Sequence, residues 1–137
     1  MPTAKKVARR RPAKMVKRLS VKRVYESPSD DDGLRILVDR LWPRGLTKAK
    51  ARLDLWLKDL APSDALRRRY HGEPTKWKEF VAAYDRELTG EPAKTAATVL
   101  LERLRHEPLA TLLFASRDEV HNNATALKRW LEHRLQE

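Results

Sequence analysis

Two short apolar runs dominate the pattern of hydrophobic and polar positions along the chain. The first extends from Leu34 to Val38 and the second from Leu109 to Ala115. Neither run alternates between apolar and polar residues, which indicates strands that are covered on both faces, as in the parallel sheets of α/β proteins. An alternating segment from Leu19 to Tyr25, rich in β-branched and aromatic residues, predicts a further strand at the start of the sheet.

Most of the segment between the two runs, and the segment after the second, has the periodicity of amphipathic helices. Helices are predicted from Ser63 to about Tyr70, from Thr75 to Leu88, from Thr95 to about His106, and from Asn122 or Asn123 onward. Residues 53–60 fit a helix and a strand equally well. The loop from Glu26 to Gly33 contains three consecutive aspartates without the spacing of an EF-hand, and we expect it to be a solvated acidic loop.

This order of elements predicts an α/β fold. Two buried strands that are separated by helices favour a short, mostly parallel sheet with helices on both faces. The length of 137 residues suits one domain, which we place at residues 19–137.

The positive charge is concentrated before this domain. The chain has 30 basic and 19 acidic residues, and residues 1–23 contain ten of the basic residues and none of the acidic ones. The rest of the chain is therefore close to neutral. We expect residues 1–18 to form a disordered basic tail, because such a segment buries too little apolar surface to fold. The region from Lys5 to Arg23 is a candidate for nucleic-acid binding, and a solubilising extension is the alternative.

The composition excludes several classes of protein. There is no cysteine, so disulfides, thiolate metal sites and cysteine nucleophiles are absent. No apolar run reaches the ~18 residues of a membrane span, and no secretory signal is visible, so we expect a cytoplasmic protein without membrane contact. The oligomeric state does not follow from the sequence.

Polar residues follow both apolar runs. In open α/β sheets, ligands bind at the carboxyl ends of the strands, and both polar loops emerge there if the two strands are neighbours. The arginines, together with the N-terminus of the last helix, favour an anionic ligand that carries phosphate or carboxylate. The residues expected to contact it are Arg40, Trp42, Arg44, Ser116, Arg117, Asn122 and Asn123.

His71, His121 and Asp39 are the candidates for acid–base chemistry, because these side chains can exchange protons near neutral pH or when perturbed. Each candidate also has a purely structural interpretation. Asp39 and Arg40 could pair with each other or cap the end of the sheet, Trp42 could lie in the core, and Asn122 could cap a helix. No nucleotide-binding fingerprint and no metal-ligand spacing is present, so we predict no metal site and name no cofactor.

Several strings resemble those of the YeaO-like family, the domain of unknown function 488. They are Arg23-Val-Tyr25, Gly33-x-Arg35-Ile-Leu-Val-Asp-Arg-Leu-Trp-Pro-Arg-Gly45, Trp56, Ala61-Pro-Ser63, Leu66-Arg67, His71, Trp77-x-x-Phe80, Tyr84, Glu87-Leu88, Thr111-Leu-Leu-Phe-Ala-Ser116 and His121-Asn-Asn-Ala124. The similarity covers residues 21–135. It implies a bacterial protein of a family without an established activity.

More distant relatives of that family look like a small Rossmann-like, three-layer domain. They carry an Asp-x-Arg at the end of one strand and a loop with cysteine and histidine at the end of another. The corresponding positions here are Asp39-Arg40 and the loop from Ser116 to His121, which has no cysteine. The resemblance also favours a short strand at residues 53–57.

Two functional hypotheses from different classes remain. In the first, the domain binds a small anionic ligand at the carboxyl ends of the strands, and whether it is an enzyme stays open. In the second, the protein associates with nucleic acid through its basic tail, and the domain is a structural or interaction module.

Overall fold

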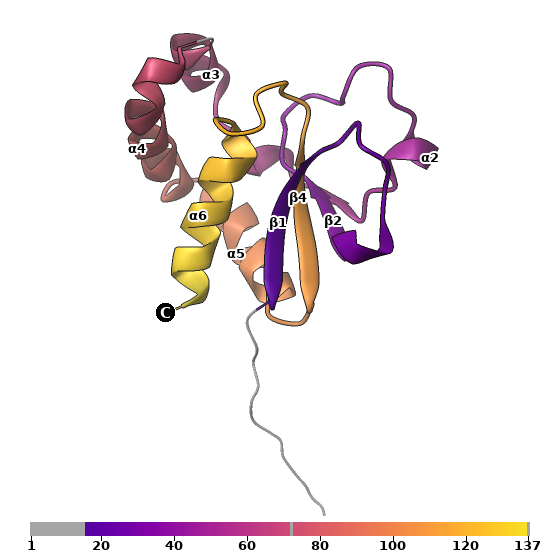
Figure 1. Cartoon of the computed structure of the whole chain (residues 1–137). Coiled ribbons are helices and arrows are strands. Elements are labelled where there is room, and N and C mark those ends of the chain that lie inside the picture. Colours follow the sequence, from indigo (N-terminus) through magenta and orange to yellow (C-terminus); the bar gives the residue numbers. More distant parts are fainter. Residues whose placement is uncertain (1–15, 72, 137) are drawn as a thin grey trace, which may run out of the picture.

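The computed structural model describes residues 16–71 and 73–136, and its centre is a four-stranded sheet (Figure 1). The strands are β1 (Arg18–Arg23), β2 (Leu34–Leu37), β3 (Leu55–Trp56) and β4 (Leu109–Phe114). Their order is β1-β4-β2-β3, and all three pairs are parallel. The predicted α/β fold is therefore confirmed, and the two apolar runs form the central pair β2–β4. The short strand expected within residues 53–57 is β3.

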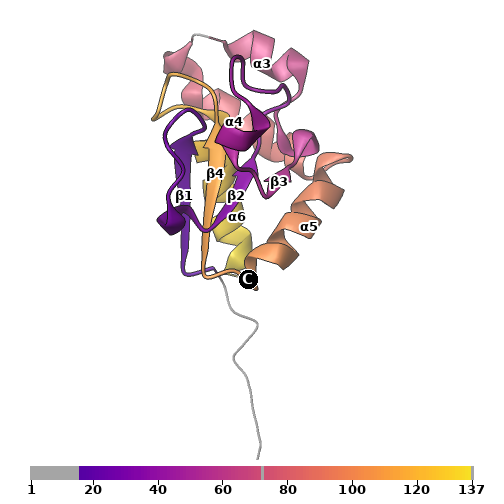
Figure 2. The same ribbon diagram turned by 90° about the vertical axis from the view of Figure 1, so that its right-hand side faces the viewer.

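Helices lie on both sides of this sheet, in unequal layers (Figures 1 and 2). The α-helices are α2 (Lys48–Ala51), α3 (Asp64–Tyr70), α4 (Trp77–Leu88), α5 (Ala93–Leu104) and α6 (Asn123–Leu135). Three 3₁₀ helices complete the set: η1 (Asp30–Asp32), η2 (Lys58–Leu60) and η3 (Pro74–Lys76). The long helices α4, α5 and α6 gather on one side, whereas the short α2 lies on the other.

The missing alternation in β2 and β4 is explained by two apolar cores. Even-numbered side chains such as Ile36 and Leu112 enter the large core beneath α4, α5 and α6. Leu37 and Leu113 point the other way, into a smaller core that the loop after β2 covers. All four side chains are fully buried. Because both faces of the sheet bury apolar residues, a period of two does not appear in the sequence.

Two helix starts differ from the prediction. Thr75 does not cap α4, because the helical backbone already begins at Pro74 in η3, and Thr75 therefore lies inside a helical turn. Helix α5 begins at Ala93 rather than Thr95, and the Glu91 carboxylate accepts hydrogen bonds from the backbone and hydroxyl of Thr95. The predicted caps Ser63 and Asn122 are present.

The loop between β1 and β2 is wrongly predicted as fully solvated. Its three aspartates form η1, and the Asp32 side chain is buried with its oxygens 3.0 Å from Lys22 Nζ and 2.6 Å from Arg35 Nη1. Burial acts against ionisation of Asp32, but hydrogen bonds from the Ser29 backbone, Lys22 and Arg35 outweigh it and lower its pKa. The aspartate thus anchors the start of β2.

The predicted tail falls mostly outside the described residues, which begin at Val16. Its proposed end at residue 18 is too late, because Arg18 is the first residue of β1. The Lys17 and Arg18 backbone N–H groups both donate to the Pro108 carbonyl, at 2.9 and 3.2 Å. None of the described helices is long and apolar enough to cross a membrane.

Candidate functional site

The loops that follow β2 and β4 lie at the same edge of the sheet, as the parallel pairing requires (Figure 1). Helix α6 starts at this carboxyl edge and runs back along the sheet. The geometry therefore brings residues 39–45 and 116–123 to one end of the molecule, which is the arrangement expected for the candidate site. The candidate side chains on these two segments do not all lie together.

Asp39 connects three elements at this edge. Its Oδ2 accepts the Ala115 backbone N–H at 2.9 Å, and its Oδ1 accepts the Asn123 amide at 3.1 Å. The same Asn123 amide also donates to the Val38 carbonyl at 3.0 Å. Burial raises the pKa of the Asp39 carboxyl, and the two hydrogen bonds offset this only partly. Asp39 therefore ties the end of β2 to β4 and α6, which is its structural interpretation.

Arg40 follows Asp39 but does not pair with it through a hydrogen bond. The only hydrogen bond that its guanidinium makes to a described residue runs from Nη2 to the Ala61 carbonyl, at 3.2 Å. Its Nε is buried and has no partner in the described part of the chain. A buried charged donor without an acceptor is unusual in a folded protein, because losing the hydrogen bond to water is costly.

Trp42 and Arg44 turn away from the other candidates. The Trp42 indole N–H donates to the Leu46 carbonyl at 2.6 Å, and its ring meets the Trp56 ring edge-on with centroids 5.3 Å apart. Trp42 thus packs against the smaller core. The Arg44 side chain is exposed, and its carbonyl accepts the Tyr25 hydroxyl at 2.8 Å. Among the described residues, neither side chain forms a hydrogen bond, ion pair or ring contact with Asp39 or Arg40.

The loop after β4 is shaped by Asp118, which the sequence analysis did not select. Its Oδ1 accepts the backbone N–H groups of Val120 and His121, at 3.0 and 2.8 Å, and these hydrogen bonds lower its pKa. The Ser116 hydroxyl accepts the Asp118 N–H at 3.2 Å. A Ser-x-Asp pattern just before a helix cap is the sequence signal for such a turn. Arg117 lies exposed on this loop.

Asn122 acts as the N-cap of α6. Its Oδ1 accepts the Thr125 N–H at 2.8 Å, and its own amide donates to the Asp118 carbonyl at 3.0 Å. The cap side chain is buried and fully engaged. Asn122 therefore fixes the helix start, while the positive end of the helix dipole points toward the carboxyl edge.

The two histidine candidates lie in different environments. His121 is half-buried and stacks on Trp77, with ring centroids 4.8 Å apart, and Trp77 in turn stacks on Phe80. His71 is exposed at the end of α3. The stacking partner Trp77 is the first residue of α4, and nothing in the sequence pairs it with a histidine.

A buried tyrosine closes the inner side of the site. The Tyr84 hydroxyl donates to the Leu60 carbonyl, and burial together with the nearby Asp39 and Glu87 carboxylates raises its pKa. Glu87 is itself engaged, because its oxygens accept the Ser63 N–H at 2.9 Å and the Ser63 hydroxyl at 2.6 Å. Across residues 16–71 and 73–136, no group of three or more histidine, aspartate or glutamate side chains could hold a metal ion.

The site can therefore offer one partly buried guanidinium with an unsatisfied Nε, a helix N-terminus and several polar backbone groups. Its two inner carboxylates already accept hydrogen bonds from the protein. This chemistry suits the recognition of an anion better than the movement of a proton.

Comparisons with known proteins agree with the resemblance seen in the sequence. A family model described as "Inactive DUF488-N3 subclade" matches residues 18–137. The uncharacterized protein Rv3073c of Mycobacterium tuberculosis (strain H37Rv) is 39% identical over 117 residues, which are 85% of this chain and 96% of that protein. The uncharacterized protein YeaO of Escherichia coli (strain K12) is 39% identical over 113 residues, or 82% and 96% of the two chains. No solved structure matches the chain significantly. The chain belongs to the YeaO-like DUF488 family, within the subclade that the family description calls inactive.

Proposed function

We propose that this protein is a binding domain for an anionic ligand, a phosphate or carboxylate, at the carboxyl edge of its sheet. The observation that carries the proposal is the buried Arg40 Nε, which has no acceptor among the described residues. A buried donor left without a partner costs about 1–3 kcal/mol, and more when it is charged. An oxygen of a bound anion would supply the acceptor and recover that free energy.

The surroundings of Arg40 favour a bound anion, rather than a carboxylate of the protein, as the hydrogen-bond acceptor for its Nε. Three carboxylates act on Tyr84. Asp39 and Glu87 are committed to other donors, and Asp85 interacts with Arg129 and Arg134. The N-terminus of α6 is held beside Asp39 by the Asn123 amide. A guanidinium and a helix N-terminus at the same edge both attract negative charge. Arg117, Ser116 and Asn123 are the further side chains that we propose for ligand contact.

We further propose that binding is not followed by catalysis. The family model that matches the chain is described as inactive. The candidate proton-transfer group Asp39 supports the same conclusion, because both of its carboxylate oxygens already accept hydrogen bonds from the protein. A general base needs a free lone pair directed at the substrate. Asp39, His121 and His71 are therefore assigned structural or binding roles in this proposal.

The experiment is a thermal unfolding series with inorganic phosphate, pyrophosphate and citrate as probes. The wild type should gain stability as each binding anion is added, because a ligand that binds only the folded state stabilises it by mass action. Arg40→Met should lose this gain. Arg86→Met, which removes an exposed arginine on α4, is the matched control and should keep it. Equal anion-dependent shifts in the wild type and Arg40→Met would refute the proposal.

A second candidate rests on the charge distribution. Ten basic and no acidic residues lie in residues 1–23. We propose that this segment contacts nucleic acid, and Figure 1 shows that the chain enters β1 at the edge opposite to the loops at 39–45 and 116–121. Binding of a labelled 20-mer DNA duplex should fall steeply with salt and disappear when residues 1–15 are deleted. Binding that survives the deletion would contradict this second proposal.

A further inference from the structure

The outer edge of β1 has no strand beside it. Strand β1 is terminal in the order β1-β4-β2-β3. The N–H groups of Arg18 and Val24 donate to carbonyls of the β4 side, at Pro108 and Phe114. Because hydrogen bonding alternates along a parallel strand, the even-numbered residues of β1 pair with β4, and the N–H and C=O groups of Leu19 and Val21 point outward. Such a row of free groups can accept an additional strand.

Two pockets lie along this edge, and they share Arg18. The first, of about 260 Å³, is lined by β1 together with Asp31, Asp32 and Thr111, so it lies on the side of η1. The second, of about 450 Å³, is lined by residues 16–19 and by α6, so it lies on the opposite side. Alternate side chains of an added strand would point to these two sides in turn.

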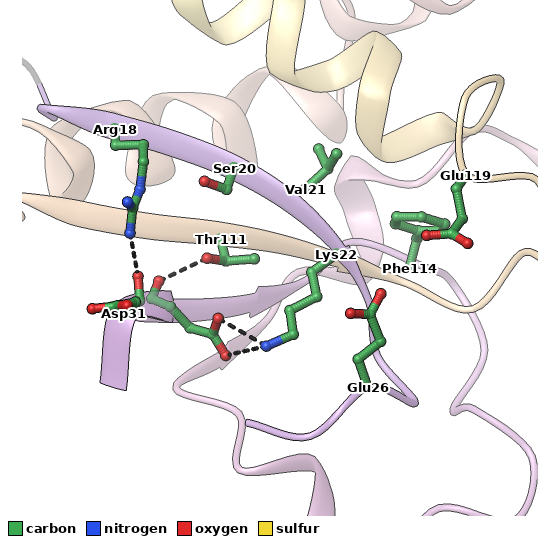
Figure 3. Close-up of a pocket in the computed structure, with 10 residues that line it drawn as sticks. Arg18, Ser20, Val21, Lys22, Glu26, Asp31, Thr111, Phe114 and Glu119 are labelled. Atoms are coloured by element: carbon green, nitrogen blue, oxygen red, sulfur yellow. Dashed lines mark hydrogen bonds and ion pairs between the residues drawn. The ribbon is translucent and has the colours of Figure 1, made fainter. Parts of the chain in front are cut away.

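The first pocket carries unpaired negative charge (Figure 3). Its two cations are already engaged: Lys22 pairs with the Asp32 carboxylate at 3.0 Å, and Arg18 donates to the Asp31 carbonyl at 2.7 Å. The carboxylates of Glu26, Asp31 and Glu119 also line the pocket. All three residues are exposed, and none of these three carboxylates forms an ion pair with another described residue. The pocket therefore favours a basic side chain.

The second pocket has both polar and apolar walls. Its apolar part is formed by Val16, Leu19 and Leu135, and two of its charged residues, Lys128 and Glu132, neutralise each other at 3.1 Å. This apolar part can contact apolar side chains of an added strand.

We propose that the outer edge of β1 binds an extended segment of a partner polypeptide by strand addition. The segment would place lysine or arginine side chains toward Glu26, Asp31 and Glu119, and apolar side chains toward α6. Backbone groups of Leu19 and Val21 would supply the hydrogen bonds, and the two pockets would supply the specificity. This surface borders the proposed anion site, because Glu119 comes from the loop after β4 that also carries Ser116 and Arg117.

A second copy of the chain fits the edge less well. If two β1 strands paired with each other, the basic side chains available to the acidic pocket would be those of Lys22 and Arg18. Both are already bound to the loop at Asp31 and Asp32 of their own chain. A partner segment with free basic side chains could enter the pocket without breaking such bonds.

The test uses two labelled peptides and the full chain. The probe Thr-Val-Lys-Val-Lys-Val-Thr should bind saturably in fluorescence anisotropy, whereas Thr-Val-Glu-Val-Glu-Val-Thr should bind at least about fivefold more weakly. The variant Val21→Pro removes an outward N–H and leaves the pairing with β4 intact, so it should abolish binding of the lysine peptide. No binding of the lysine peptide to the wild type would overturn the proposal.

A second variant tests the proposal independently of whether Val21→Pro folds. Glu26→Lys combined with Glu119→Lys changes only exposed side chains and should reverse the preference between the two peptides. An unchanged preference would overturn the proposal. Light scattering after size exclusion provides a further check: a dimer that Val21→Pro dissociates would show that a second copy occupies the edge, which would also overturn it.

Discussion

Replacing Asp39 with alanine should destabilise the protein by about 2–4 kcal/mol. The carboxylate accepts hydrogen bonds from Ala115 and Asn123, at 2.9 and 3.1 Å. Hydrogen bonds to charged groups contribute about 1.5–3 kcal/mol each. The loss is reduced because the variant no longer buries a carboxyl group, whose burial raises its pKa. Asp39→Asn keeps an oxygen for the Ala115 N–H and should cost about half as much.

The assay is urea unfolding followed by tryptophan fluorescence, with the free energy extrapolated to water. Asn123→Ala is the companion variant, because it removes one of the two donors to Asp39 and its bond to the Val38 carbonyl. A double variant should be less destabilised than the sum of the two single ones, since the sites interact. A free-energy change below about 1 kcal/mol for Asp39→Ala would refute the role of this residue in joining β2, β4 and α6.

Three further predictions concern pH and the buried parts of the fold. Because the pKa of Asp39 is raised above 3.8 in the folded state, ionising this carboxyl costs more in the folded protein than in the unfolded chain. The part of the stability that depends on its bound proton is therefore present at low pH and lost as the pH rises through the folded pKa. The unfolding free energy of the wild type relative to Asp39→Asn, measured in urea, should therefore decrease from pH ~3 to ~7. Arg35→Met should cost about 3–5 kcal/mol in the same assay, because it removes the buried donor to the Ala51 carbonyl and one of the two cations that bind Asp32. Arg103→Met, at an exposed ion pair, should change stability by less than about 1 kcal/mol. A small effect of Arg35→Met would contradict the buried ion pair. Gly33→Ala should lower the melting temperature strongly, because the new Cβ would lie 2.1 Å from the Leu109 carbonyl oxygen; Gly45→Ala, also at positive φ but in open space, should cost only about 1 kcal/mol. Equal effects of the two substitutions would argue against that close contact.

The strands could be predicted because their apolar runs are unlike the rest of the chain. The order of elements was then enough to place the ends of β2 and β4 at one edge, which the pairing of Ile36 with Leu112 confirms. The role of Asp32 could not be predicted, because its partners Lys22 and Arg35 approach it only after the loop folds over the sheet. Sequence spacing carries no information about such contacts between separate elements.

The convergence of the two loops could be predicted from the sequence, but the direction of their side chains could not. The composition of a loop shows which side chains it carries but not where they point. Trp42 illustrates this, because its indole N–H donates to the Leu46 carbonyl within the same loop. The unsatisfied Nε of Arg40 depends on which carbonyls lie around it, and Ala61 comes from a segment 21 residues away. Only the folded chain could therefore single out Arg40 among the arginines of the two loops.

The most direct test of anion binding is a titration of the protein with inorganic phosphate, followed through the arginine Nε–Hε signals in a ¹⁵N NMR spectrum. Arg40→Met identifies the Arg40 signal by its disappearance. We predict that this signal moves saturably as phosphate is added, and that the Arg86 signal stays in place. An Arg40 signal that does not move with phosphate, pyrophosphate or citrate would contradict anion binding at Arg40.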